Sequence, residues 1–204
     1  MRRLLYVPII HSEADMGSMA EPLKQQYIQQ FGLDRWREHV ATVEDMWRGI
    51  RDKILALNLD YGKLKIYQDG LPLCGKELEI MEDVARLGSH NYNIVRELVK
   101  MGAELIGTEE ARLLVEEYNF VKELTTISDS EERRLAVKKA RKRRDELLIE
   151  RDKFVSQRIA ETLKEGEAGI LFSGIEHEID KYLPKDIKVE YIIYRLPFRK
   201  LQWA

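Results

Sequence analysis

Apolar positions along the chain recur with different spacings, and these spacings predict alternating strands and helices. Continuous or alternating apolar runs predict strands at residues 4–10, 64–67, 103–106, 170–172 and 189–194. Apolar residues three or four positions apart predict helices at residues 18–59 with a break at Gly32, 77–86, 92–101, 109–121, 131–164 and 175–183. This alternation indicates an α/β fold: a mainly parallel sheet of about five strands, with helices on both faces and one long charged helix.

Local signals refine some of these boundaries. Pro8 has no N–H group for a sheet ladder, so the first strand lies at an edge at this point or is already ending. Thr108 is positioned to cap the helix that follows it. Ser128 and Glu131 have the spacing of a capping box, which predicts that the long helix begins there.

The composition fits one soluble globular domain. The chain has 204 residues, 44% hydrophobic and 34% charged, and we expect a single α/β domain over residues 1–204 with a helical excursion at about 111–165. A net charge of −2 gives no general preference for nucleic acid or anionic membranes. Cys74 is the sole cysteine, which excludes an internal disulfide, and no apolar run reaches the ~18 residues of a membrane span. We therefore expect a cytoplasmic protein.

Histidines follow the ends of two predicted strands. His11 comes directly after the first strand, with Glu13 and Asp15 close behind it, and His177 follows the fourth strand, beside Glu176. Open α/β sheets bind their ligands at the carboxyl ends of the strands. We therefore expect His11 and His177 to meet at this edge of the sheet, in one site.

Other charged residues give further candidates, each with a plainer alternative. Asp69 ends the second strand, although Asp69-Gly70 is also an ordinary turn pair. Glu109 follows the third strand, although an acid in the first turn of a helix also suits the helix dipole. Arg151, followed by Asp152, lies near the apolar stripe of the long helix, so its guanidinium is expected to point inward, toward an anionic partner or ligand.

The long helix also carries a dense basic run, Lys138–Arg144, in which six of seven residues are basic. Alone, this run suggests a nucleic-acid patch. Over residues 131–152, however, acids alternate with bases at spacings of three and four, as in ion pairs on a solvated helix face. We expect an exposed helix and no specific nucleic-acid site.

The order of these features resembles the superfamily that joins TraB/PrgY proteins, Tiki proteases, GumN-type proteins, erythromycin esterases and haem-binding ChaN proteins. Its members share an early G-x-x-H, a strand-end glutamate, a G-x-E, a helical E-R-N/D and a late G-x-x-H. This chain has Gly107–Glu109, Glu150–Asp152 and Gly174–His177 for the last three motifs. It departs from the pattern at Pro8, where the family has glycine, and at Asp69, where the family has glutamate.

The resemblance implies a hydrolase of peptidase or esterase type, with a divalent metal ion as its expected cofactor. Imidazole and carboxylate groups suit such a metal. Glu109 or Glu13 would take a proton from the attacking water, and Arg151 would hold a substrate carboxylate or an oxyanion. The expected metal ligands are His11, Asp69 and His177. The further ligand-binding candidates are Asp15, Asp152 and Glu176.

Other functions stay open. The same histidines can bind haem or another small molecule without catalysis, as the resemblance to ChaN proteins implies. In a plainer alternative, the histidines only form hydrogen bonds at strand ends, and the protein is a regulatory or interaction module that uses Lys138–Arg144 as its contact. The expected partner is a small-molecule or peptide substrate, with homo-oligomers left open.

Overall fold

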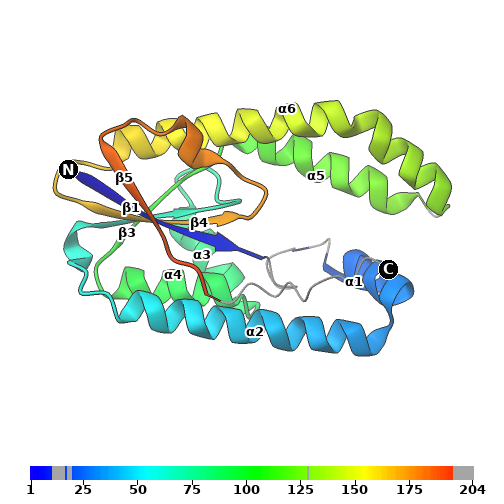
Figure 1. Ribbon diagram of the computed structural model, residues 1–204, viewed down its shortest axis with the longest axis horizontal. Helices are drawn as coiled ribbons and strands as arrows, with labels where there is room; N and C mark the ends of the chain where they lie inside the picture. The colour runs from blue at the N-terminus through cyan, green and yellow to red at the C-terminus, as the bar shows by residue number, and fades with distance from the viewer. Residues whose placement is uncertain (11–16, 18–19, 128, 195–204) are drawn as a thin grey trace.

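The computed structural model describes residues 1–10, 17, 20–127 and 129–194 (Figure 1). Its centre is a sheet of five strands in the order β3-β2-β4-β1-β5, in which every pairing is parallel. The strands are β1 (Arg2–Ile9), β2 (Leu64–Gln68), β3 (Glu104–Ile106), β4 (Ala168–Gly174) and β5 (Ile187–Tyr191). The predicted α/β class is confirmed, and the sheet is parallel throughout rather than mainly parallel.

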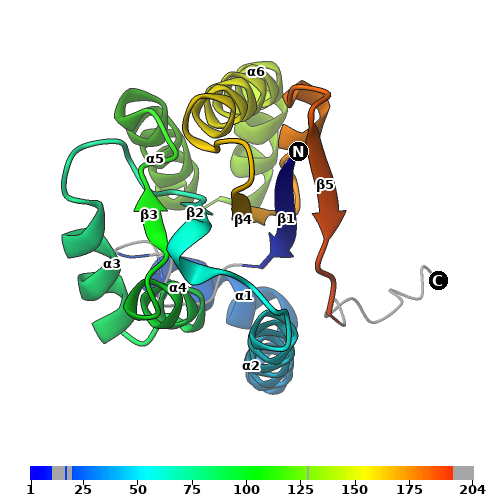
Figure 2. The same cartoon turned by 90° about the vertical axis from the view of Figure 1, so that its left-hand side faces the viewer.

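Helices cover both faces of the sheet, as predicted (Figure 2). The α-helices are α1 (Ala20–Phe31), α2 (Leu33–Leu55), α3 (Glu77–Arg86), α4 (His90–Lys100), α5 (Ala111–Thr126) and α6 (Ser130–Thr162). Short 3-10 helices, η2 (Tyr61–Lys63) and η3 (Ile179–Tyr182), precede β2 and β5. Helices α2, α3 and α4 pack against one face, and α6 packs against the other with α5 beside it.

The pleat of the strands explains the continuous apolar run at the start of the chain. In β1, Leu5 and Val7 face the core under α2, α3 and α4, whereas Leu4 and Tyr6 face the core under α6. Successive side chains of a strand point to opposite faces, and both faces of this strand are covered. Every position from Leu4 to Val7 is therefore buried.

Some strand and helix boundaries follow the predictions and others do not. Gly32 separates α1 from α2 at a φ of 89°, a conformation that favours glycine. Pro8 pairs in register with Ser173 of β4, but the pairing of β1 with β5 ends at Tyr6. On the β5 side, β1 is therefore an edge strand at Pro8, as predicted. Residues 175–183 form a turn followed by η3 rather than the single helix that the pattern predicted.

The cap predicted for α5 was wrong, and the residue predicted to cap α6 lies outside the described part of the chain. Thr108 does not cap α5; its hydroxyl donates to the carbonyl of Ile106 at 2.9 Å and accepts the N–H of Gln68 at 3.0 Å. It joins β3 to β2, a role that depends on their pairing and not on the next helix. The cap of α6 is Asp129, and Ser128 lies outside the described residues.

The order of the strands places a topological switch point at the carboxyl edge of the sheet. The segment after β2 leads to α3, whose Met81 and Ala85 lie in one core, while the segment after β4 leads to η3, whose Ile179 lies in the other. These neighbouring strands therefore send their connections to opposite faces. Open α/β sheets bind ligands at such switch points, so the carboxyl ends of β2 and β4 frame the candidate site.

Candidate functional site

An arginine surrounded by acids lies at the carboxyl edge of the sheet. Arg151 of α6 donates to Glu109 through Nε and Nη2, at 3.1 and 2.6 Å, and to Asp69 through Nη2 at 2.8 Å. Its Nη1 donates to Glu117 of α5 at 2.6 Å. The side chains of Arg151, Asp69 and Glu109 are each at most 6% exposed. One guanidinium therefore ties α6 to α5 and to the ends of β2 and β3, largely out of water.

A histidine–aspartate pair adjoins this arginine. His177, in the turn after β4, binds Asp152 of α6, with 2.5 Å between Nδ1 and Oδ1. The other Asp152 oxygen accepts the backbone N–H of Glu178 at 2.8 Å, which fixes the carboxylate beside the ring. Because a carboxylate only accepts hydrogen bonds, Nδ1 carries a proton. The second ring nitrogen, Nε2, lies 3.5 Å from Asp69.

Asp69 connects the arginine to the histidine. Its Oδ1 accepts from Arg151 at 2.8 Å, and its Oδ2 accepts the backbone N–H of Gly174 at 2.8 Å and lies 3.5 Å from His177. The side chain therefore bridges the neighbouring ends of β2 and β4. Asp69 also stands in the predicted turn, because Gly70 follows it at a φ of 76°. The turn and the site use the same residue.

Glycine is required before Glu109 for a steric reason. A Cβ atom on Gly107 would lie 2.7 Å from the Cα of Leu73 and 2.7 Å from the carboxylate of Glu77. No real Cβ approaches a backbone atom so closely, so only glycine lets this segment pack against the loop after β2. The segment then carries Glu109 to the guanidinium of Arg151.

The buried face of α6 delivers the arginine and the aspartate together. Leu147, Arg151, Val155 and Ile159 follow one another at steps of four residues, and all are buried. Residues four apart lie on the same side of a helix, so Arg151 stands in the apolar stripe itself, as its position in the sequence predicted. Asp152, next to it, is buried as well.

The surroundings shift the acid–base behaviour of the site. Burial raises the pKa of Glu109 by more than the Arg151 guanidinium lowers it, so this carboxyl holds a proton more readily than an exposed one. Burial lowers the pKa of His177, but the hydrogen bond to Asp152 and the charge of Asp69 raise it by more. The net pKa of His177 therefore lies above its ordinary value of 6.5.

Acids outnumber bases in this cluster even when every group is charged. The basic members are Arg151 and His177. The acidic members are Asp69, Glu109, Glu117 and Asp152. Burial is the main cause of the raised pKa of Glu109, and the neighbouring charge of Asp69 adds to it.

Several predicted residues fall elsewhere. His11, Glu13 and Asp15 lie outside the described residues, so their share in the site stays a prediction. The register of β1 places Ile9 opposite Gly174, and the ends of β1 and β4 therefore lie side by side. Glu176 does not join the cluster.

Glu176 instead lies on the surface, where it forms an exposed ion pair with Arg144. The pair links α6 to the turn that carries His177.

Two groups that sequence reasoning missed also support the site. Glu117 completes the shell of Arg151, and its spacing from the buried Leu113 on α5 was an available signal. The hydroxyl of Tyr6 donates to the carbonyl of His177 at 3.3 Å, which no local pattern indicates.

The described residues do not by themselves form a metal site. Among them, no group of three or more His, Cys, Asp and Glu side chains is arranged to hold a metal ion. The oxygens of Asp69 and Glu109 already accept hydrogen bonds from N–H groups of Arg151 and Gly174. The predicted metal centre requires His11, which lies outside the described residues, and it stays a prediction.

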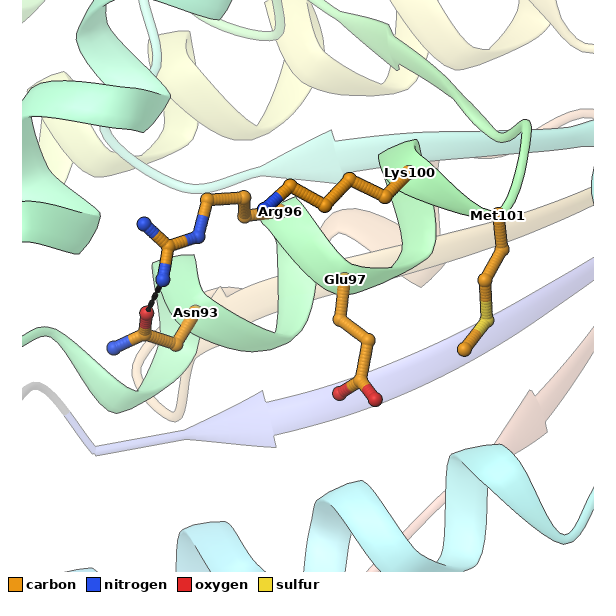
Figure 3. Close-up of a pocket in the computed structure, with 5 residues that line it drawn as sticks. All are labelled: Asn93, Arg96, Glu97, Lys100 and Met101. Carbon is orange, nitrogen blue, oxygen red and sulfur yellow. Dashed lines mark hydrogen bonds between the residues drawn. The ribbon is translucent and has the colours of Figure 1, made fainter.

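Hollows on the surface lie on both sides of the sheet. A hollow of about 230 Å³ lies between α5 and α6 and is lined by Glu116, Asn119, Phe120, Glu123, Arg143, Arg144 and Leu147. Another, of about 400 Å³, lies along α4 and is lined by Asn93, Arg96, Glu97, Lys100 and Met101 (Figure 3). The α4 hollow contains no predicted site residue and lies on the opposite face of the sheet from α6. The α5–α6 hollow is lined by Glu116, the neighbour of Glu117 in the chain.

The basic run of α6 is exposed to solvent, as expected. From Lys138 to Arg144, every residue except Ala140 is exposed. Arg143 lies 2.8 Å from Glu150 and 2.6 Å from Glu116, while Lys142 lies 3.7 Å from Glu146. Acids of α5 and α6 therefore neutralise part of the run.

Comparisons with protein-family models, with curated proteins and with solved structures gave no match. The resemblance to the TraB/PrgY–Tiki–erythromycin esterase–ChaN superfamily therefore stays a prediction. Within the described part of the chain, no helix combines the length and the apolar character that a membrane crossing requires.

Proposed function

We propose that the protein is a hydrolase of esterase or peptidase type, whose acid–base group is His177. The observation that carries the proposal is the buried series Asp152–His177–Asp69–Arg151 at the switch point of the sheet. A carboxylate orients one ring nitrogen of the histidine, and the other nitrogen faces a cluster of perturbed charged groups. Such an arrangement is typical of catalytic acid–base groups.

The residues support a division of roles. His177 enters as the imidazolium and gives its Nε2 proton to the leaving group as the scissile bond breaks. The attacking water forms the new bond to carbon and loses its proton to Glu109, whose raised pKa makes it a stronger base than an exposed glutamate. Arg151 binds a negatively charged group of the substrate. Asp152 holds the ring of His177 in place and is a positioning residue.

A non-catalytic binding protein is the second candidate. The observation that favours it is the mutual satisfaction of the cluster: the oxygens of Asp69, Glu109 and Asp152 all accept hydrogen bonds from the chain itself. A network of this kind also rigidifies a fold without any reaction. Haem is the ligand to test first, since an imidazole is its common axial ligand.

The test is a hydrolysis screen with p-nitrophenyl esters and peptide p-nitroanilides, on wild type and on His177→Ala and Asp152→Asn. Loss of a catalytic acid–base group lowers turnover by about 100-fold or more. His90→Ala is the matched control, because His90 is an exposed histidine on α4. Metal analysis of the same preparations and the effect of a chelator test the predicted divalent metal.

The outcomes separate the candidates. Turnover that falls in the His177 variant, keeps its level in the His90 variant and leaves the melting temperature within a few degrees supports the hydrolase. Full activity in His177→Ala, or a loss of stability alone, refutes it. A Soret band that forms on adding haemin, without turnover of any ester or anilide, favours the binding protein.

A further inference from the structure

The three nitrogens of the Arg151 guanidinium have different surroundings. Nε and Nη2 donate to Glu109 and Asp69, whose side chains are 1% and 6% exposed. Within the described residues, Nη1 donates to Glu117 alone, at 2.6 Å, and the Glu117 side chain is 42% exposed. The buried carboxylates are fixed parts of the site. Among the described carboxylates that Arg151 contacts, Glu117 is the one that is exposed to solvent.

The hollow between α5 and α6 begins next to this contact. Phe120 and Leu147 supply its apolar surface. Phe120 follows Glu117 by three residues on α5, and Leu147 precedes Arg151 by four on α6. Helices α5 and α6 run side by side (Figure 1). Each separation is about one helical turn, so the hollow lies one turn further along the contact between the two helices.

We propose that Glu117 is a displaceable cap over an anion site on Arg151, and that the ligand is a carboxylate that carries an apolar group. The carboxylate replaces that of Glu117 on Nη1, and the apolar group lies in the hollow against Phe120 and Leu147. The proposal rests on the proposed function, in which Arg151 meets the substrate. It adds the class of substrate and the residue that competes with it.

The charges of the site favour a carboxylate over other ligands. Exchange of one carboxylate for another leaves the charge around Arg151 unchanged, and the released Glu117 side chain turns into the solvent that it already contacts. A phosphate dianion would add charge beside Asp69 and Glu109, where acids already exceed bases. A carboxylate oxygen also forms a charge-assisted hydrogen bond with Nη1 of the kind that Glu117 forms there.

The experiment measures the binding of hydrocinnamate and of its uncharged amide to the full chain, by calorimetry, without any need for turnover. The variants are Glu117→Gln and Glu117→Ala, and the control is Glu123→Gln, an acid that lines the same hollow. We expect hydrocinnamate to bind about tenfold more tightly to both Glu117 variants, since a cap closed nine-tenths of the time lowers the apparent affinity by that factor. The amide should gain nothing. Shifts of the Arg151 side-chain NMR signals on addition of hydrocinnamate provide the second readout.

Several results would overturn the proposal: unchanged affinity in the Glu117 variants, an equal gain in Glu123→Gln, an equal gain for the amide, or Arg151 signals that do not move. Failure of the proposed hydrolase is a separate result. Hydrocinnamate that binds more tightly to the Glu117 variants of a protein without turnover supports the anion site and refutes catalysis. Turnover that depends on His177, together with hydrocinnamate binding that the Glu117 variants do not change, supports catalysis and refutes the anion site.

Discussion

Replacement of Arg151 by methionine tests the central claim that one buried guanidinium holds the carboxyl edge of the sheet together. The change removes four hydrogen bonds to three carboxylates, two of which, Asp69 and Glu109, are almost fully buried. Methionine replaces the apolar stem of the arginine at similar length, so the loss is mainly electrostatic. Removal of one partner from a buried ion pair costs about 3–5 kcal/mol, because the other charge stays buried without compensation.

We expect Arg151→Met to lose about 3–5 kcal/mol in the free energy of unfolding at pH 7. The assay is urea denaturation followed by circular dichroism. With a slope of about 2 kcal/mol per molar urea, the midpoint falls by roughly 2 M while the slope itself is unchanged. Arg144→Met is the matched control on the same helix: its pair with Glu176 is exposed, and such pairs contribute about 0–1 kcal/mol.

The loss in Arg151→Met should also depend on pH. Burial already raises the pKa of Glu109 in the wild type, and removal of Arg151 raises it further. A carboxyl whose pKa is higher in the folded state binds more protons when folded, so its contribution to stability falls as pH rises from about 4.5 through the folded pKa. The defect should therefore be smaller at pH 5 than at pH 7. A loss below about 1 kcal/mol at pH 7, or one that matches Arg144→Met, would refute the reasoning.

Three further predictions concern other parts of the molecule. Asp152→Asn should lower the pKa of His177, measured by NMR titration of the ring, and an unchanged titration would contradict the pairing. The wild type should lose stability as pH rises above 6.5 through the folded pKa of His177, and this loss should be smaller in Asp152→Asn. Gly107→Ala should lower stability by about 1–3 kcal/mol through overpacking, whereas Gly62→Ala, whose Cβ meets its nearest atom at 3.5 Å, should change it little; equal melting temperatures would contradict this. The wild type should bind DNA and RNA only weakly in fluorescence anisotropy, and neutralisation of the lysines in Lys138–Arg144 should leave this affinity unchanged. Tight, salt-sensitive binding by the wild type that the neutralised variant loses would contradict the prediction.

The sequence by itself determined the order and type of the elements. The apolar periods predicted five strands and the main helices, and the bounds predicted for α3 match those of the structure. The reason is that periodicity is local information: a strand covered on both faces must be apolar throughout, as β1 is from Leu4 to Val7. The position of Arg151 in an apolar stripe likewise predicted a buried cation that needs an anionic partner.

Tertiary structure alone decided which groups become partners. Arg151 was expected to hold a substrate carboxylate, yet its N–H groups bind Asp69, Glu109 and Glu117 of the chain itself. The spacing of Glu117 from Leu113 indicated that it faces inward, but not that it meets Arg151, because that contact arises only through the packing of α5 against α6. Similarly, Thr108 satisfies the backbone of β2 instead of capping α5, since the pairing of β2 with β3 offers its hydroxyl a nearer partner. Residue types limit the chemistry that a site can hold, and the packing of distant segments decides which charges meet and which are left for a ligand.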